Sequence, residues 1–436
     1  MKKTKANLEQ LKQQLYNPPS KRRDLKIMWQ ANAPWANSGY SVFSRDLCFR
    51  LLKDGWNVVF SGAGAGVDAY PIEVHGEDLI DDRFKGLKLK VYPRMGDPYG
   101  SDALIAHGMA SKANVIFNMQ DVWVLNPQQL SKIKTFIPYC PVDRYPVSQN
   151  VIANLQYAYK IITFSRFGQK ALDEKGFTST LIVEGTDTEM FKPMDKTEIR
   201  KNYGIPQDAF LFGMIAANKE NPPRKGFQEA MEAFKLFHDK HPEAAMFFHS
   251  QQQTPGGFPI RQLSRELGVG DRCFFYDDYL SQFGSRSHQV VEQINMFDVL
   301  MHPSQTEGFG LTIIEAGACG IPVLVNNTTS MPELVIPGVT GEICKTDRHR
   351  FTPDNSWVWT ADVNDLYKCM ERLYARLHQP NTIAEDCRKH IVENYNIDTL
   401  TKTAWIPLME NLQEELLPPT LTKPVEEDKI ELPATV

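Results

Sequence analysis

The sequence predicts an α/β protein with two Rossmann-like domains, each built on a doubly wound parallel sheet. Three observations support this. Apolar segments typical of buried strands alternate with amphipathic helical segments, the alternation loosens around residues 195–207, and it then resumes. The 436 residues also suffice for two domains of ordinary size. Because parallel sheets bind ligands beyond the carboxyl ends of their strands, we expect the functional site in the cleft between the domains.

The first domain is predicted over residues 25–200. Its first strand is LKIMWQ at 25–30, followed by a loop that contains NSGYS. A helix over 42–55 ends at Gly55, a residue typical of helix C-termini. The further strands expected here are WNVVFSG, ANVIFNMQD, KTFIPYCPVD and KIITFS.

The second domain is predicted over residues 201–390. Its strands are expected at AFLFGMIAA, AAMFFHS, RCFFYDD, FDVLMHPS and IPVLVNN, with an amphipathic helix at GFQEAMEAFKLFHDKH. A helix over 391–415 is expected to pack back on the first domain. The Pro-rich, acidic residues 416–436 are expected to form a disordered tail. Residues 1–24 form a basic arm with seven Lys or Arg and two acids.

Composition narrows the class of protein. Hydrophobic residues make up 42% and charged residues 23%, which is typical of a soluble globular chain. The net charge of −5 gives the whole molecule no electrostatic case for nucleic-acid binding. Seven dispersed cysteines without a CxxC pair argue against a disulfide framework or a zinc site. With no signal peptide and no membrane-spanning stretch in the sequence, a cytoplasmic location is predicted.

Ligand-binding groups are predicted in a loop of each domain. Ser38 and Gly39 follow the first strand, where a glycine lets backbone approach a ligand; the alternative is a plain turn. In the second domain, Lys219, Arg224 and Lys225 gather where a helix starts. Helix N-termini disfavour cations, so this gathering suits a bound polyanion. The alternative is a solvated surface.

The stretch EGFGLTIIEAGACGIPVL at 307–324 places two carboxylates at the start of one helix. Glu307 follows a buried strand, and Glu315 lies in the first turns of the helix. A helix N-terminus carries free amides and partial positive charge, so fixed carboxylates there need hydrogen-bond donors to bind. A sugar offers such donors, and a diphosphate suits the amides.

This stretch resembles the signature of family 4 of the retaining glycosyltransferases (the group 1 glycosyltransferases), which have the GT-B fold. The resemblance covers roughly residues 25 to 345 and is most specific in the second domain. Its first-domain matches, NSGYSVFSRDL and IPYCPVDRYPV, are looser. The other matching stretches are FSRFGQKAL, EGTDTEMFKP, PPRKGFQEAMEAF, DVLMHPSQTEGFG and SMPELV.

The resemblance implies transfer of a sugar from a UDP- or GDP-sugar to an acceptor hydroxyl, with retention of the anomeric configuration. Arg224 and Lys225 would stabilise the departing diphosphate. Glu307 would accept hydrogen bonds from sugar hydroxyls, and Glu315 from ribose hydroxyls. Lys219 stands where the family more often has Arg. The remaining donor-binding residues implied are Ser38, Gly39, Gly308, Phe309, Gly310 and Leu311.

The resemblance implies front-face attack, so no general base is required. Asp143 is a catalytic candidate near the transferred sugar, with a loop carboxylate as the alternative, and Asp121 is a weaker candidate for acceptor contact. His107 and His302 are interpreted as structural. No cofactor is expected, and no metal, because the basic residues supply the charge and the sequence DDY at 277–279 lacks DxD spacing.

The acceptor stays open between a lipid-linked molecule, a saccharide, a protein and a nucleic acid. The basic arm is either a solvated terminus or a weak contact to an anionic surface, which would place the protein peripherally at a membrane. Two other functions fit the same fold: a nucleotide-sugar-binding protein without catalysis, and a sugar-nucleotide epimerase.

Overall fold

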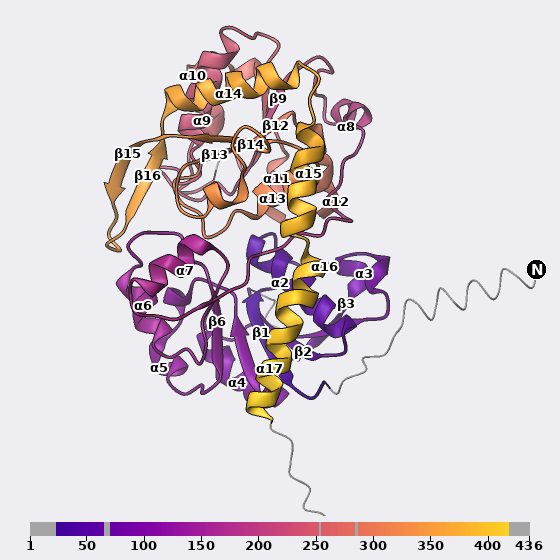
Figure 1. The fold of residues 1–436 in the computed structure, drawn as a ribbon, viewed down its shortest axis with the longest axis vertical. Coiled ribbons are helices and arrows are strands. Elements are labelled where there is room, and N and C mark those ends of the chain that lie inside the picture. Colours follow the sequence, from indigo (N-terminus) through magenta and orange to yellow (C-terminus); the bar gives the residue numbers. More distant parts are fainter. Residues whose placement is uncertain (1–22, 65–69, 253, 284–286, 418–436) are drawn as a thin grey trace, which may run out of the picture.

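The structure is a computed structural model that describes residues 23–64, 70–252, 254–283 and 287–417. The basic arm predicted over 1–24 and the tail predicted over 416–436 lie outside this range, apart from two residues of each. Within the described ranges, no helix combines the length and apolarity needed to cross a membrane. Figure 1 shows two domains, one above the other, joined by segments that pass between them.

The sheet of the first domain has the strand order β3-β4-β2-β1-β5-β6-β7-β8. All neighbours pair in parallel except β3, which pairs antiparallel with β4 at the edge. Residues 76–87 connect these two strands and contain one short helix and one 3-10 turn. The strands are β1 (Lys26–Asn32), β2 (Asn57–Ala63), β3 (Ile72–His75), β4 (Lys88–Tyr92), β5 (Val115–Asn118), β6 (Phe136–Cys140), β7 (Ile162–Thr163) and β8 (Thr180–Leu181).

Helices cover both faces of this sheet, so its central strands are buried on both sides. In β1, Ile27 and Trp29 belong to one hydrophobic cluster and Met28 to another, as the alternation of side chains along a strand requires. The helices of the first domain are α2 (Gly39–Lys53), α3 (Gly76–Leu79), α4 (Ser101–Ser111), α5 (Pro127–Leu130), α6 (Gln149–Leu155) and α7 (Arg166–Asp173), with the 3-10 turns η1 (Asp82–Phe84) and η2 (Val122–Val124).

The second domain repeats the architecture with a six-stranded sheet in the order β11-β10-β9-β12-β13-β14, paired in parallel throughout. Two parallel-sheet domains confirm the predicted fold class. The strands are β9 (Leu211–Ile215), β10 (Ala245–His249), β11 (Cys273–Phe275), β12 (Val299–His302), β13 (Val323–Asn326) and β14 (Gly341–Cys344). The helices and 3-10 turns are α8 (Lys196–Asn202), α9 (Phe227–His238), α10 (Ile260–Glu266), η3 (Gly270–Arg272), α11 (Asp278–Phe283), α12 (Ser287–Met296), α13 (Leu311–Ala318), η4 (Met331–Leu334), α14 (Val363–Leu377) and α15 (Ile383–Asn394).

A separate antiparallel hairpin, β15 (Thr346–Phe351) and β16 (Trp357–Ala361), follows β14. It projects from the second domain toward α7 of the first (Figure 1). This hairpin is not among the elements predicted from the sequence.

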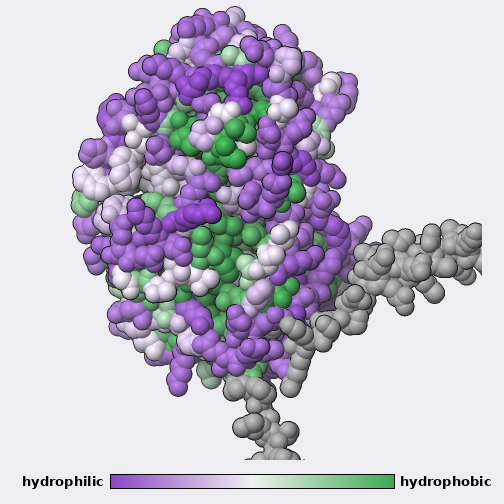
Figure 2. Space-filling view, in the orientation of Figure 1, coloured by the Kyte–Doolittle hydropathy of each residue, from purple (hydrophilic) through white to green (hydrophobic). Residues whose placement is uncertain are grey.

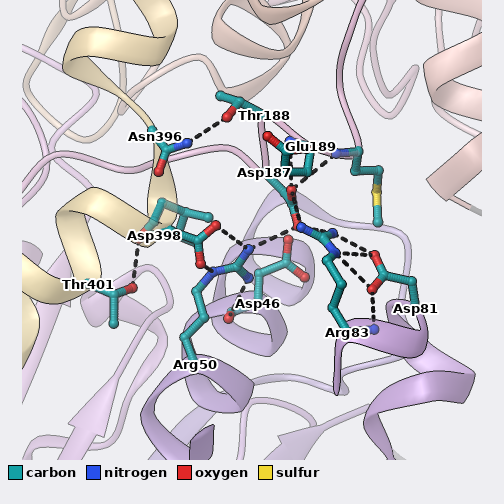
Figure 3. Close-up of polar contacts among 12 residues, drawn as sticks. Asp46, Arg50, Asp81, Arg83, Asp187, Thr188, Glu189, Asn396, Asp398 and Thr401 are labelled. Carbon is teal, nitrogen blue, oxygen red and sulfur yellow. Dashed lines mark hydrogen bonds and ion pairs between the residues drawn. The ribbon is translucent and has the colours of Figure 1, made fainter. Parts of the chain in front are cut away.

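The chain passes between the domains twice, once after β8 and once after α15. The two passing segments pair with each other, because Thr186 N donates to Tyr395 O and Ile397 N donates to Thr186 O. Arg50 of α2 binds both: it donates to Asp187 on the first segment and to Asp398 on the second. Figure 3 shows this cluster, in which Asp187 also accepts from Arg83 of η1. The crossings are therefore anchored to the first domain.

After the second crossing, α16 (Ile397–Leu400), a π-helical turn η5 (Thr401–Trp405) and α17 (Ile406–Leu416) lie along the first domain (Figure 1). Trp405 is fully buried against Trp29 and Tyr139, with ring centroids 5.5 and 5.1 Å away. Arg23 pairs with Glu410 of α17 at 2.8 Å. On the face drawn in Figure 2, hydrophilic residues predominate, and hydrophobic residues show within each half.

Candidate active site

Lys225 and Glu307 form the centre of the candidate site. Lys225 precedes α9 and Glu307 lies in the loop after β12, and Lys225 Nζ is 2.6 Å from Glu307 Oε1. Glu307 is 9% exposed. Burial opposes its ionisation, but the charge of Lys225 and a hydrogen bond from His302 hold the pKa of Glu307 well below its usual value. The carboxylate is therefore ionised at neutral pH.

Arg224 adds a second cation beside the same carboxylate. Its Nη1 donates to Thr306 O at 2.6 Å and lies 3.8 Å from Glu307 Oε2. Its Nε donates to Glu220 at 3.2 Å. The two predicted cations thus meet the predicted sugar-binding carboxylate, although 82 residues separate them in the chain.

His302, interpreted from the sequence as structural, contacts the site directly. It ends β12, with its Nε2 3.0 Å from Glu307 Oε1 and its Nδ1 3.2 Å from Thr312 Oγ1 in the first turn of α13. The imidazole therefore fixes the Glu307 carboxylate relative to that helix. In the sequence, this contact was indicated only by the short separation of the two residues, because His302 lies five residues before Glu307. His107 instead hydrogen-bonds Ser61 and packs on Tyr92, within the first domain.

The loop between Glu307 and α13 is fixed by hydrogen bonds to its carbonyl groups, and its backbone N–H groups are available to a ligand. Ser330 Oγ donates to the carbonyls of Glu307 and Phe309, at 2.9 and 2.8 Å. Gly310 caps α13 with φ of 116°, a conformation that favours glycine. Among the described residues, no acceptor binds the N–H groups of Phe309, Gly310 and Leu311. These are the amides that the sequence analysis predicts for donor binding, at a helix N-terminus suited to an anion.

The first domain approaches this loop closely. A Cβ on Gly308 would lie 3.0 Å from Phe164 and 3.2 Å from Pro141, both in the first domain. A Cβ on Gly39 would meet the Leu311 side chain at 3.9 Å, so two predicted donor-binding residues face each other. The Phe309 side chain is buried, which leaves only its backbone for a ligand.

Glu315 and Glu184 are buried near Glu307, each 5% exposed. Burial, together with the charge of Asp46, raises the pKa of Glu315 to about 8. Burial, together with Glu315 and Glu307, raises the pKa of Glu184 to about 8. Glu315 was predicted, whereas Glu184 was missed, although it opens the family-like stretch EGTDTEMFKP.

Asp121 and Asp143 reach the site from the first domain. Burial and the nearby charge of Asp143 raise the pKa of Asp121 to about 6. Tyr40 donates to Asp121 at 3.3 Å. Arg224 interacts electrostatically with both carboxylates, which places them across the domain junction from the second-domain cations. Tyr40, beside Gly39, is a site residue that sequence reasoning missed.

Two predicted donor-binding residues do not contact the residues gathered around Glu307. Ser38 caps α2, because its Oγ accepts from Ser41 N at 3.2 Å and from Asn32 Nδ2 at 2.9 Å. Lys219 is exposed, and no described residue binds its ammonium group. Over the described ranges, no group of three or more His, Cys, Asp or Glu is placed to hold a metal ion. Metal-independence stays a prediction about the reaction.

Most of the second domain is similar to a known protein family. Residues 195–350 match the family model described as Glycosyl transferases group 1. A D-inositol 3-phosphate glycosyltransferase of Stackebrandtia nassauensis is 28% identical over 169 residues, covering 37% of this chain and 36% of that relative. The match therefore spans little more than a third of the relative's length.

Solved structures resemble nearly the whole chain. Sucrose-phosphate synthase from Thermosynechococcus elongatus has a TM-score of 0.70 at 19% identity, covering 89% of this chain and 100% of that one. Anabaena HepE in complex with UDP-glucose has a TM-score of 0.63 at 16% identity, covering 88% and 100%. The fold is GT-B, as predicted.

Proposed function

We propose that this protein transfers a sugar from a nucleoside-diphosphate sugar to an acceptor hydroxyl, because residues 195–350 match the family model described as Glycosyl transferases group 1. One observation carries the proposal. The ionised Glu307 lies between Lys225, Arg224 and His302, beside the unused amides at the start of α13. An anion site and a sugar-hydroxyl acceptor thus lie side by side.

The charges suit a diphosphate leaving group. Arg224 and Lys225 bring two positive charges and Glu307 one negative, a net charge of +1 from these three side chains. The α13 N-terminus adds roughly half a positive charge. A bound diphosphate would restore a near-neutral site, and the fixed donors would stabilise the charge that develops as the bond to C1 breaks.

In this proposal, one carboxyl group of the protein binds each end of the donor. Glu307 accepts hydrogen bonds from hydroxyls of the transferred sugar, and Glu315 binds the ribose hydroxyls. Glu307 suits its role because Lys225 and His302 keep it ionised and oriented. Glu315 has a pKa of about 8, so hydroxyl donors from a ribose would favour its ionised form on binding.

We further propose a retaining, metal-independent reaction. The bond between C1 and the phosphate oxygen breaks, the acceptor oxygen bonds to C1 on the same face, and the acceptor proton passes to the diphosphate. No protein base is required, so Asp143 and Asp121 are assigned to contacts with the transferred sugar and the acceptor. Arg224, Lys225 and the amides supply the positive potential that a metal ion would otherwise provide.

A thermal-shift screen with UDP, GDP, ADP and their sugars tests donor binding. We expect one nucleotide and its sugar to raise Tm, because binding to the folded state alone stabilises it. The Glu315→Gln variant serves as the comparison, with a smaller shift expected. No shift with any member of the panel would contradict the proposed function.

The reaction and its product test the proposals of retention and metal-independence. Proton NMR of the product reads the anomeric coupling constant, and we expect the configuration of the donor. An inverted product would remove the retaining assignment. The same reaction with EDTA is expected to proceed, and strict dependence on added Mg²⁺ would remove the metal-independent assignment alone.

A further inference from the structure

A cavity of about 450 Å³ lies at the domain junction beside the candidate site. Its walls come from four segments: the loop after β6, helix α7, the loop after β13, and the β15–β16 hairpin. This volume is within the range typical of small-molecule sites. The proposed donor site does not use the residues that line it.

The hairpin closes one side of this cavity by contacts to the first domain. Trp357 N donates to Tyr145 O at 2.8 Å, and Ser356 Oγ donates to Pro146 O at 2.8 Å. Arg144 forms an ion pair with Asp354 in the hairpin turn. In Figure 1 the hairpin reaches from the upper domain to the level of α7. The cavity therefore depends on an element outside both main sheets.

The floor of the cavity is joined to the loop of Glu307. Thr329 lines the cavity, and its Oγ1 accepts from Glu307 N at 3.0 Å. On the opposite side, Tyr145 lines the cavity two residues after Asp143, which faces Arg224. The segments that carry Thr329 and Tyr145 therefore both contact or contain residues of the proposed reaction site. A molecule in the cavity would lie next to the transferred sugar.

The lining combines aromatic faces with neutral hydrogen-bonding groups. Trp359, Phe167 and Tyr145 contribute aromatic rings. Among the neutral groups, Thr328 is 6% exposed, and its hydroxyl has no partner among the described residues. Asn327 and Thr346 supply an amide and a second hydroxyl. Aromatic faces that pack on C–H surfaces, beside hydroxyl partners, suit a sugar ring.

The charge of the lining argues against polyanionic acceptors, which are among the classes that the sequence leaves open. Lys170 and Glu174, at the exposed end of α7, are the charged residues of the lining, and their charges cancel. Binding a nucleic acid or an anionic headgroup requires several cations near the phosphates. We therefore propose that this cavity holds an uncharged sugar ring of a saccharide acceptor. This assignment rests on the proposed glycosyltransferase function.

Binding of saccharides tests the assignment without a transfer step. The probes are the methyl α-glycosides of glucose, mannose and galactose, and maltose, measured by saturation-transfer NMR and calorimetry. We expect at least one to bind, and Trp359→Ala to weaken that binding about tenfold or more. Asn327→Ala, at an exposed side chain of the same wall, provides a second variant that spares the hairpin. The control is Trp123→Ala, because Trp123 is 53% exposed and lies outside the lining.

Three outcomes would overturn the assignment. The first is that no saccharide probe binds. The second is that saccharide binding survives both Trp359→Ala and Asn327→Ala. The third is that a twelve-nucleotide single-stranded DNA binds in place of sugars, and that its binding depends on Trp359. Kinetics of sugar transfer distinguish failure of the cavity assignment from failure of the proposed glycosyltransferase function. If Trp359→Ala leaves the acceptor KM unchanged in an active enzyme, only the cavity assignment fails; if no nucleotide sugar binds, the proposed function itself fails.

Discussion

Arg50 and Asp187 form a buried ion pair at the point where the chain passes between the domains. Arg50 Nη2 lies 2.9 Å from Asp187 Oδ2, and the side chains are 3% and 0% exposed. Arg83 binds the same carboxylate, and Arg50 also binds Asp398 of the returning segment (Figure 3). Burial opposes ionisation of Asp187, but its contacts with Arg83 and Arg50 lower its pKa to about 2.

Asp187→Asn is expected to lower the free energy of unfolding by about 3 kcal/mol, because it removes the carboxylate that the buried Arg50 shares with the partly exposed Arg83. Urea denaturation followed by tryptophan fluorescence measures this. The control is Glu73→Gln, which breaks the exposed Lys88–Glu73 pair and should change stability by less than about 0.5 kcal/mol. Equal effects of the two variants would show that the buried pair has no special role.

Lys225→Ala is expected to lower kcat at saturating donor by on the order of 10²-fold or more, the scale of losing one preorganised charge-stabilising group. Lys225 lies against Glu307 at the site, whereas Lys235 on the following helix α9 pairs with Asp239. Lys235→Ala is therefore the matched control, with kcat unchanged. An unaltered kcat in Lys225→Ala would exclude its diphosphate role.

Glu307→Gln is expected to keep affinity for the nucleoside diphosphate and to lower sugar transfer by roughly 10- to 100-fold, the value of hydrogen bonds to a charged group. The carboxylate contacts the loop cation Lys225 but is assigned to the sugar and not to the nucleotide. Calorimetry with the bare diphosphate and a transfer assay measure the two quantities separately. Loss of diphosphate affinity with full transfer would reverse the assignment.

The parts of the site that the sequence predicted are those encoded locally. The strand FDVLMHPS, the glycines after Glu307 and the helix that follows are consecutive, so apolar pattern and turn chemistry place Glu307 beside a helix N-terminus. Lys225 was found in the same way, from cations before an amphipathic helix. The alternation of strands and helices predicted five strands of each sheet, and missed β3, β4 and β8 in the first and β14 in the second.

The missed features depend on contacts between distant segments. The β15–β16 hairpin is held by Tyr145, more than 200 residues earlier, and β15 is exposed on most of its length, so the hairpin lacks a clear alternating pattern. Glu184 reads as an ordinary loop acid until the fold buries it near Glu307 and Glu315. Edge strand β3 was missed because it is short and none of its four residues is buried. Burial and pairing of this kind are properties of the tertiary structure.

Glu184 and Glu315 provide the last prediction, because burial raises the pKa of both carboxyls to about 8. In the unfolded chain a Glu titrates near pH 4.3. Between these values each of these two carboxyls binds more protons in the folded state than in the unfolded state, so its contribution to stability falls as pH rises from about 5 to 8. The expected slope is about 1.4 kcal/mol per pH unit for each group that is still protonated in the folded state.

Glu184→Gln and Glu315→Gln replace each carboxyl with a neutral group of the same shape, so each variant should flatten this decline and be more stable than the parent at pH 8. Urea unfolding at pH 5, 6, 7 and 8 measures the free energy of unfolding across the window. Glu73→Gln, at an exposed side chain, is the control that should leave the slope unchanged. A parent protein whose stability is flat or rises between pH 5 and 8, with variants that follow it, would show that both carboxyls ionise near their ordinary pKa in the folded state.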